Sequence, residues 1–273
     1  MMGVTSTSSS PPDDPVSNDP SGPAVAGAVP LADHIAEAER VIDAARQQGL
    51  TMRAVGGVAI CLQSPGKKPL MPRQLKDIDL VTPRKSGRDS ARIIEGLGYV
   101  GEEMFNALRG SRRQLYRDPV NGRDLDVFIG EFSMCHAIPL ADRLDHDPYT
   151  VPLAELLLTK LQIVELNERD ERDIYSICYH HELTEDGRTG IDAAFVARLC
   201  AGDWGLWRTC KGTIERCIAD IGRYDLDPAA QEEVKRILSQ LWDRIEQEPK
   251  TGKWKRRSRI GERKRWYDEP EEV

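Results

Sequence analysis

Hydrophobic and polar positions alternate along this chain with two different periods. Apolar side chains recur three and four positions apart in residues 31–48, 89–97 and 152–167, a spacing that predicts amphipathic helices. Short apolar runs between the earlier segments alternate with a period of two, which predicts strands. Residues 191–247 read as mostly helical, including a helix that Asp227 caps, that Pro228 begins and that extends through residue 241. We therefore expect an α/β (α+β) fold, in which a small mixed sheet flanked by helices is followed by a helical region.

Two acid pairs interrupt the apolar runs of the predicted strands. They are Asp77-Ile78-Asp79-Leu80 and Asp124-Leu125-Asp126-Val127. Residues two apart on a strand share a face, so each pair would project its carboxylates together while the intervening residues enter the core. Side by side, two such strands would gather three or four carboxylates, whose repulsion favours a bound divalent cation such as Mg²⁺. The alternative is that the pairs lie on solvated strand faces and hold no metal.

Two adjacent glycines precede the first acid pair. The segment Met52-Arg53-Ala54-Val55-Gly56-Gly57-Val58-Ala59-Ile60 reads as a strand that ends at the glycines, where a helix can begin. Glycine lets the backbone approach a ligand closely, and a helix N-terminus presents N–H groups to an anion such as a triphosphate. A Gly-Gly turn is also a common structural feature.

The order of these motifs resembles that of a known superfamily. It consists of Gly56-Gly57-Val58-Ala59, a basic stretch ending Arg73-Gln74-Leu75-Lys76, then Asp77-Ile78-Asp79-Leu80 and Leu125-Asp126-Val127-Phe128. The set resembles the DNA polymerase β-type nucleotidyltransferases, and among them the minimal and AbiEii-like members that include toxins of bacterial toxin–antitoxin systems. The resemblance extends to residues 151–161 and to Arg172-Asp173-Ile174-Tyr175. It thus covers residues 50 to 180, without the first thirty residues or the C-terminal segment.

The resemblance implies a nucleotidyltransferase fold and a set of site residues. The implied activity is transfer of a nucleoside monophosphate from an NTP to an acceptor hydroxyl, with two Mg²⁺ ions. The implied catalytic residues are Asp77, Asp79, Asp126, Lys160 and Asp173. The implied metal ligands are Asp77, Asp79 and Asp126, with Asp124 as the other candidate for the third carboxylate. The implied nucleotide-binding residues are Gly56, Gly57, Lys76 and Lys160.

Two departures from the superfamily pattern affect the expected nucleotide contacts. Val58 follows the second glycine where many members have a serine, so backbone N–H groups must replace a hydroxyl contact to phosphate. The segment between Gly57 and Asp77 is also longer than in the smallest members, and Pro65-Gly66-Lys67-Lys68-Pro69 reads as a loop insertion.

The sequence predicts that the chain is divided into four segments. Residues 1–30 are rich in Ser, Pro, Asp and Gly and predict a disordered leader without the features of a secretory signal. Residues 31–148 would form the nucleotidyltransferase catalytic domain, and residues 149–250 a helical C-terminal domain. Residues 251–273 would form a flexible tail, basic and then acidic.

Composition and cysteine spacing favour a cytoplasmic protein. The net charge is −7, and no apolar run is long enough to span a bilayer, so no membrane association is expected. The six cysteines show no CxxC spacing, which favours buried thiols over a disulfide framework. Cys178-Tyr179-His180-His181 contains zinc-ligand residue types, but it lacks a second pair.

One glycine motif matches a dinucleotide-binding fingerprint. Gly96-Leu97-Gly98-Tyr99-Val100-Gly101 has the G-x-G-x-x-G spacing. In a dinucleotide site this motif follows a strand and opens a helix, whereas here it follows a predicted helix and precedes a predicted strand. We interpret it as a turn from helix to strand.

The C-terminal segment bears on the acceptor of the expected transfer. Lys253-Trp254-Lys255-Arg256-Arg257-Ser258-Arg259 and Arg263-Lys264-Arg265-Trp266 are basic with interleaved tryptophans, which suits RNA through its phosphates and unpaired bases. The resemblance to toxin-type enzymes implies a tRNA 3′ end as one acceptor, with which the basic segment is compatible, and an antitoxin protein as a partner. The alternatives are a small molecule, as in aminoglycoside nucleotidyltransferases, a protein hydroxyl, or a catalytically silent RNA- or partner-binding module.

Overall fold

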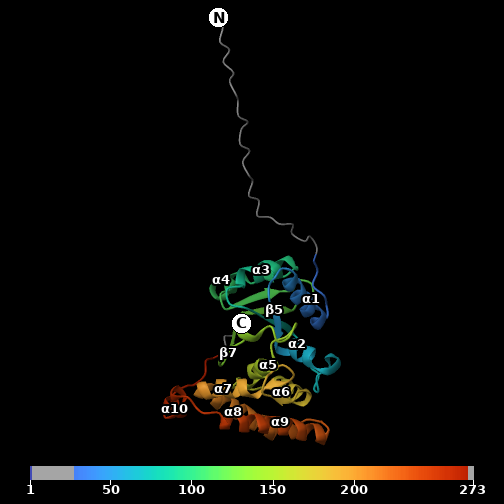
Figure 1. The fold of residues 1–273 in the computed structure, drawn as a ribbon. Coiled ribbons are helices and arrows are strands. Elements are labelled where there is room, and N and C mark those ends of the chain that lie inside the picture. Colours follow the sequence, from blue (N-terminus) through green and yellow to red (C-terminus); the bar gives the residue numbers. More distant parts are fainter. Residues whose placement is uncertain (2–27, 270–273) are drawn as a thin grey trace.

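The structure, a computed structural model, describes Met1 and residues 28–269. The expected disordered leader lies outside these residues except for Met1 and residues 28–30. A five-stranded mixed sheet forms the centre of the N-terminal half (Figure 1), in the order β1-β2-β5-β4-β3. β2 and β5 are parallel, and the other neighbouring strands are antiparallel. The strands are β1 (Arg53–Val55), β2 (Asp77–Thr82), β3 (Val100–Gly101), β4 (Arg113–Arg117) and β5 (Asp124–Ile129). The expected combination of a mixed sheet with helices is confirmed.

The remaining elements are mainly helices. The earlier ones are α1 (His34–Gln47), α2 (Gly56–Gln63), α3 (Gly87–Gly96), α4 (Glu103–Arg109) and α5 (Leu153–Leu161). The later ones are α6 (Glu168–His180), α7 (Ala193–Gly202), α8 (Trp204–Asp220), α9 (Pro228–Gln247) and α10 (Gly252–Ser258). Four single-turn 3₁₀ helices are η1 (Pro65–Lys67), η2 (Ala141–Arg143), η3 (Ile221–Arg223) and η4 (Gly261–Arg263). Two small ladders pair β6 (Glu131–Ser133) with β7 (Ala137–Pro139) and β8 (Leu183–Thr184) with β9 (Ile191–Asp192).

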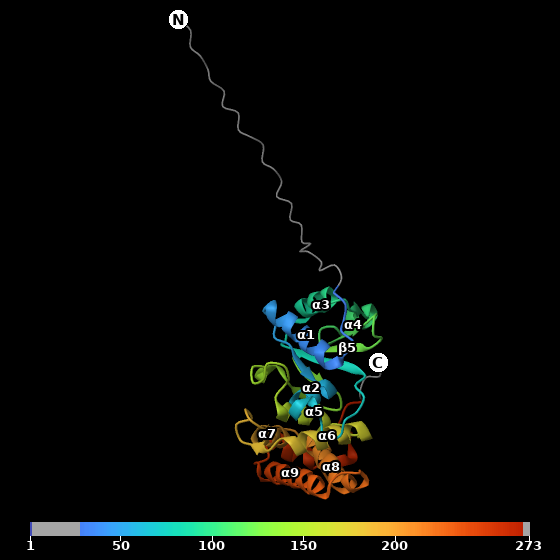
Figure 2. The same cartoon turned by 90° about the vertical axis from the view of Figure 1, so that its right-hand side faces the viewer.

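The elements form an upper and a lower part in both ribbon views. α1, α3 and α4 lie with the sheet in the upper part, and α6, α7, α8 and α9 form the lower part, with α2 and α5 between them (Figures 1 and 2). Most of the buried apolar side chains belong to one continuous cluster that extends from Ala38 on α1 to Ile245 on α9. The sheet and the helical region therefore share a core across the expected boundary at residue 148.

Local signals explain where several helices begin and end. Asp227 caps α9 by accepting from the Ala229 N–H at 2.7 Å, and Pro228 is its first residue, as expected. The helix expected over residues 152–167 is shorter, because α5 ends at Leu161. Asn167 is instead the N-cap of α6, where its side chain accepts from two backbone N–H groups. Asn167 thus marks the start of α6 and not the end of the preceding helix.

The glycine motif Gly96 to Gly101 is a turn from helix to strand, as interpreted from the sequence. Gly96 ends α3, and residues 100–101 form β3. Gly98 has a φ of +97°, a left-handed conformation that glycine adopts without strain. No strand precedes a helix N-terminus here, so this motif is not a dinucleotide-binding turn.

The segment expected to be a flexible tail is ordered structure over residues 251–269, which include α10 and η4. Trp254 packs edge-on against Trp207, with ring centroids 5.2 Å apart, and Trp266 packs against Trp204 at 6.2 Å. These tryptophans therefore contact aromatic side chains of the protein itself. Residues 270–273 lie outside the described residues.

Two expectations from composition can be compared with the described residues. All six cysteines are buried and unpaired, which agrees with the interpretation as buried thiols. Among the helices of residues 28–269, none combines the length and the apolar character that crossing a membrane requires.

Candidate active site

The two acid pairs meet on neighbouring strands. β2 and β5 are parallel and in register, so that Asp77 lies opposite Asp124 and Asp79 lies opposite Asp126. The intervening residues, Ile78 among them, are buried in the core. The carboxylates therefore lie together at the N-terminal ends of β2 and β5, with the period of two that the sequence indicated.

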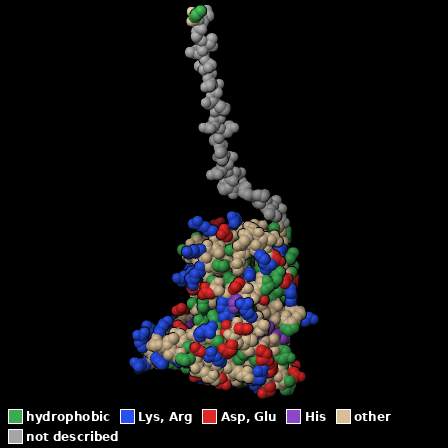
Figure 3. Space-filling view, viewed as in Figure 1, with side chains coloured by type: hydrophobic (Ala, Val, Ile, Leu, Met, Phe, Trp, Pro, Cys, Tyr) green, Lys and Arg blue, Asp and Glu red, His purple; other side chains and the backbone are tan. Residues whose placement is uncertain are grey.

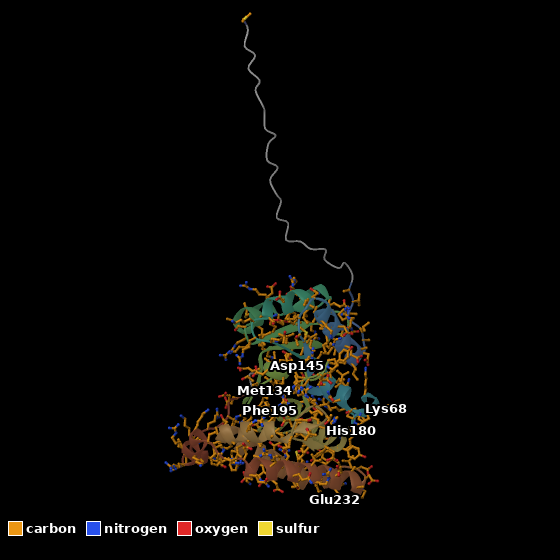
Figure 4. All side chains as sticks on the ribbon, viewed as in Figure 1. Lys68, Met134, Asp145, His180, Phe195 and Glu232 are labelled. Carbon is orange, nitrogen blue, oxygen red and sulfur yellow. The ribbon has the colours of Figure 1, made fainter. Side chains whose placement is uncertain are left out.

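A cleft of about 850 Å³ opens over three of these carboxylates, a size that suits a small-molecule ligand. Asp77, Asp79 and Asp126 line it, whereas Asp124 lines only an adjoining hollow beside α4, which Asp77 and Asp126 also line. Other residues that line the cleft include Gly56, Arg113, Phe132, Met134, Thr159, Lys160, Ile163, Asp170 and Tyr267. Figure 4 shows Met134 between the sheet and the lower helices, where the cleft lies.

The N-terminus of α2 abuts Asp79. Gly56, the first residue of α2, has a φ of +69°, and a Cβ there would stand closer than 3.0 Å to Asp79 Oδ2. Val55 precedes it and pairs with Asp79 across β1 and β2. Only glycine can bring the backbone this close to the carboxylate, and Gly56 lines the cleft beside Asp79.

The charge on Asp79 lacks full compensation. Burial raises the pKa of Asp79 to about 7, and the negative charges of Asp77 and Asp126 add to the shift, against the opposing effect of Lys160 and Arg113. Burial also raises the pKa of Asp126 despite its arginine partner. The cleft thus favours additional positive charge beside these carboxylates.

Arg113 on β4 holds Asp126. Its Nε and Nη2 donate to the two carboxylate oxygens of Asp126 at 2.8 and 3.0 Å. Asp124, which points to the other hollow, instead pairs with the exposed Arg117 at 2.6 Å. Among the two candidates for the third carboxylate, Asp126 is the one that faces the cleft.

A second charged group faces the carboxylates across the cleft. Lys160 Nζ on α5 lies 3.1 Å from Asp170 Oδ1 and 3.0 Å from Asp173 Oδ2. Burial opposes its charge, but these two carboxylates outweigh that effect and raise the pKa of Lys160. Lys160 is therefore a charged ammonium group at the cleft, and Asp173 is one of its two carboxylate partners.

Arg73 is a site residue that sequence reasoning missed. Its Nε and Nη2 donate to both oxygens of Asp173 at 2.8 Å each. A Cβ on Gly57 would lie 2.6 Å from Arg73 Nη2, so the guanidinium lies against the first turn of α2. Lys76, the basic residue expected to contact nucleotide, is exposed, and neither it nor Arg73 lines the cleft. Arg73 is connected to the cleft through Asp173, which also contacts Lys160. Arg73 and Lys76 both belong to the irregular segment before β2, where spacing does not show which side chain turns inward.

The donor chemistry of the cleft fits Mg²⁺, although the ligands are not preassembled. Mg²⁺ prefers carboxylate oxygens, and Asp77, Asp79 and Asp126 supply them where positive charge is favoured. In residues 28–269, however, no group of three or more Asp, Glu, His or Cys side chains has the arrangement of a formed metal site. Arg113, which engages both oxygens of Asp126, accounts for part of this difference.

Comparison with known proteins adds no functional assignment. No protein-family model matches the chain, and no curated protein is similar to it in sequence. The function is therefore inferred from the residues of the cleft and their geometry.

Proposed function

We propose that this chain is a nucleotidyltransferase of the polymerase β type, which transfers a nucleoside monophosphate from an NTP to an acceptor hydroxyl. The observation that supports this most is the register of Asp79 with Asp126 in a cleft that also contains Gly56 and Lys160. Carboxylates on one side and an ammonium group on the other match the needs of a bound metal–triphosphate.

The residues divide into metal ligands and phosphate ligands. Asp77, Asp79 and Asp126 would hold Mg²⁺, which when bound supplies positive charge to the triphosphate and lowers the pKa of the acceptor hydroxyl. The backbone N–H groups at Gly56 and Gly57 and the Lys160 ammonium group bind and orient the phosphates. Asp173 and Arg73 hold Lys160 in place through the contacts described above.

The transfer exchanges one phosphorus–oxygen bond for another. The acceptor oxygen forms a bond to the α-phosphorus, the bond from that phosphorus to the bridging oxygen breaks, and pyrophosphate leaves. A carboxylate oxygen of Asp126 accepts the proton of the acceptor hydroxyl. Before this step, Asp126 must give up at least one of its two hydrogen bonds from Arg113, so that the carboxylate oxygen is free to accept the proton.

A nucleic-acid acceptor is supported by the basic surface of residues 253–265. This segment contains eight Lys and Arg residues and one acidic residue, Glu262, although the whole chain has a net charge of −7. Figure 3 shows Lys and Arg side chains gathered over α10. A hollow of about 760 Å³ beside them shares Cys135 and Tyr267 with the catalytic cleft. A strand bound to this surface could thus reach the carboxylates with its 3′ end.

A labelling experiment tests the transfer. Purified protein is incubated with each α-labelled NTP and Mg²⁺ in the presence of total tRNA, protein or aminoglycosides, and the fraction that acquires label is identified. We expect label in tRNA. Label in aminoglycosides or protein would instead identify one of the other acceptors.

Two matched variants test the site itself. Asp79→Asn should retain the fold and lose nearly all transfer, because phosphoryl chemistry depends on charge neutralisation. Asp124→Asn, on the same sheet but outside the cleft, should retain most activity. Equal activity of Asp79→Asn and the unmodified chain, or no binding of Mg²⁺–NTP in calorimetry, would contradict the proposal and favour a catalytically silent module.

A further inference from the structure

The hollow of about 760 Å³ beside α10 is lined by more positive than negative side chains. Two carboxylates, Asp203 and Asp268, face five cations there. The cations are Lys253, Arg256, Arg257, Lys264 and Arg265. The hollow therefore differs in charge from the chain as a whole, whose net charge is −7.

Three of these five cations have partners within the chain. Lys253 Nζ lies 4.0 Å from Asp203 Oδ2, and Arg265 Nη2 lies 2.7 Å from Glu269 Oε1. Arg257 donates to backbone carbonyl oxygens of its own segment at 2.7 and 2.8 Å. The protein itself thus satisfies these three side chains.

The other two cations, Arg256 and Lys264, are exposed and lack such partners. Among residues 28–269, no side chain or carbonyl oxygen forms an ion pair or a hydrogen bond with either of them. Their backbone is nevertheless held in place. Arg256 lies on α10, which packs through Trp254, and the Lys264 carbonyl oxygen accepts from Arg257 Nη2 at 2.8 Å. Two ordered cations without a carboxylate partner favour a ligand with more than one negative charge.

Tyr267 connects this hollow with the catalytic cleft. Tyr267 and Cys135 line both of them. After α10 the chain returns from the lower helices toward β7 (Figure 1), where the Asp268 N–H donates to the Cys135 carbonyl oxygen at 3.0 Å. On the other side of Tyr267, the Trp266 Nε1–H donates to Thr209 Oγ1 at 3.1 Å. The partly exposed Tyr267 ring is therefore fixed between the two hollows.

The size of the hollows and the chemistry of these three side chains select one ligand. Hollows of about 760 and 850 Å³ each hold one small ligand, so each takes a short piece of an unpaired strand and excludes a duplex. Separate cations bind the phosphates of such a strand, and an aromatic ring stacks on its bases. An acidic polypeptide would satisfy the cations but would give the tyrosine no planar partner. Single-stranded nucleic acid fits both.

We propose that Arg256 and Lys264 bind phosphates of a single-stranded acceptor and that Tyr267 stacks on a base near its 3′ end. This inference rests on the proposed function, in which the 3′ hydroxyl is the group that reacts. The strand lies in the hollow beside α10 and passes Tyr267 into the catalytic cleft. The acceptor therefore enters unpaired, and a 3′ end within a duplex is not a substrate.

The phosphate contacts are tested by the salt dependence of binding. Fluorescence anisotropy on the full chain, without NTP, measures the affinity for a short single-stranded RNA and for the same RNA in a blunt duplex. Arg256→Gln/Lys264→Gln should weaken binding of the single strand about tenfold. It should also lower the slope of log K against log salt by about 1.4, at about 0.7 for each lost phosphate contact.

A second double variant controls for the loss of charge. Lys85 and Arg88 are exposed residues at the start of α3, in the upper part of the molecule, and neither has an ion pair in the part of the chain that the structure describes. Lys85→Gln/Arg88→Gln should leave the slope nearly unchanged. A slope that falls equally in both double variants would overturn the phosphate contacts.

The stacking contact is tested at constant charge. Tyr267→Ala should weaken binding of the single strand about tenfold without changing the salt slope, because a base loses its aromatic partner. Tyr267→Trp should restore the affinity. Tyr179→Ala, at an exposed tyrosine on α6, is the matched control and should have no effect. A loss that tryptophan does not restore would indicate a structural role for Tyr267 and would overturn the stacking.

The remaining outcomes separate this proposal from the catalytic one. Equal affinity for the duplex would overturn the unpaired strand. Unchanged RNA binding in Arg256→Gln/Lys264→Gln, with Mg²⁺–NTP binding intact as evidence of folding, would overturn the site even if the chain labels tRNA. Polyglutamate that binds as tightly as the RNA would assign the hollow to an acidic protein segment instead. RNA binding that depends on these residues in a chain that transfers no label would support the site while contradicting the proposed function.

Discussion

Arg113 binds both carboxylate oxygens of Asp126, at 2.8 and 3.0 Å. In the proposed enzyme a metal ion and this guanidinium therefore compete for the same oxygens. The pair is mostly buried, so its hydrogen bonds are stronger than those of an exposed ion pair. The chain thus contains its own counter-charge for the third carboxylate in the absence of metal.

Replacing the guanidinium should favour the metal. In Arg113→Gln we expect Mg²⁺ to bind about tenfold more tightly, because the strongest competitor for Asp126 is removed. The metal-free variant should be less stable than the unmodified chain, since a buried carboxylate loses its partner. Titration calorimetry with Mg²⁺ and denaturation in EDTA measure the two effects. Unchanged or weaker Mg²⁺ binding would show that Asp126 is not a ligand.

Gly56 should not tolerate a side chain. Gly56→Ala would place a Cβ against Asp79 Oδ2 and strain a residue with φ of +69°, so the free energy of unfolding should fall by about 2 kcal/mol. Binding of Mg²⁺–NTP should weaken as Asp79 is displaced. Gly96→Ala, at the end of α3 with open space around it, should leave both quantities nearly unchanged. Equal behaviour of the two variants in denaturation would contradict the close approach.

The raised pKa of Asp79 makes stability depend on pH. The pKa rises from 3.8 to about 7 on folding, so between these values the folded state holds a proton that the unfolded chain has lost. The free energy of unfolding of the metal-free protein should therefore fall as the pH rises through this window. The side chain of Asp79→Asn cannot ionise. At pH 8 the free energy of unfolding of this variant should therefore exceed that of the unmodified chain by on the order of 1 to 2 kcal/mol, a value reduced to account for the partial exposure of Asp79.

Denaturation in EDTA at a series of pH values measures this difference. Near pH 4 the two proteins should have similar stability, because Asp79 is then protonated in the folded state of the unmodified chain. A difference that is constant from pH 4 to pH 8 would contradict the raised pKa. Added Mg²⁺ should stabilise the unmodified chain more at pH 8 than at pH 5.5, since the ion binds the ionised carboxylate.

Local pattern predicted the residues of the site better than it predicted their partners. The period of two placed Asp77 with Asp79 on one face, and the glycines marked the start of a helix beside them. Arg113 could not be found in this way, because its approach to Asp126 depends on β4 pairing with β5. Such pairings are set by the tertiary structure, which local spacing does not contain.

The C-terminal segment shows the same limit. Its composition is polar and basic, which is typical of a solvated tail. Trp254 and Trp266 nevertheless pack against tryptophans of α8, and Arg257 lies over the Trp204 ring at 4.6 Å. A few aromatic contacts therefore hold this segment against α8 although its composition is polar and basic. The surface of α8 against which the segment packs is formed only in the folded chain.

Arg73, and not Lys76, should be the basic residue of the segment before β2 on which nucleotide binding depends. Arg73→Gln removes both hydrogen bonds to Asp173 and leaves that carboxylate to Lys160. Asp173 is then no longer fixed by a second cation and orients Lys160 less well toward phosphate. We expect Mg²⁺–NTP to bind about tenfold more weakly and the free energy of unfolding to fall by about 2 kcal/mol.

Two further variants make this result specific. Arg73→Lys keeps the charge but cannot make two parallel hydrogen bonds, so its nucleotide affinity should lie between those of Arg73→Gln and the unmodified chain. Lys76→Gln changes an exposed side chain outside the cleft and should alter stability by less than about 0.5 kcal/mol. If Lys76→Gln weakens NTP binding more than Arg73→Gln does, the segment before β2 rearranges when nucleotide binds, and the basic residue expected from the sequence is the correct one.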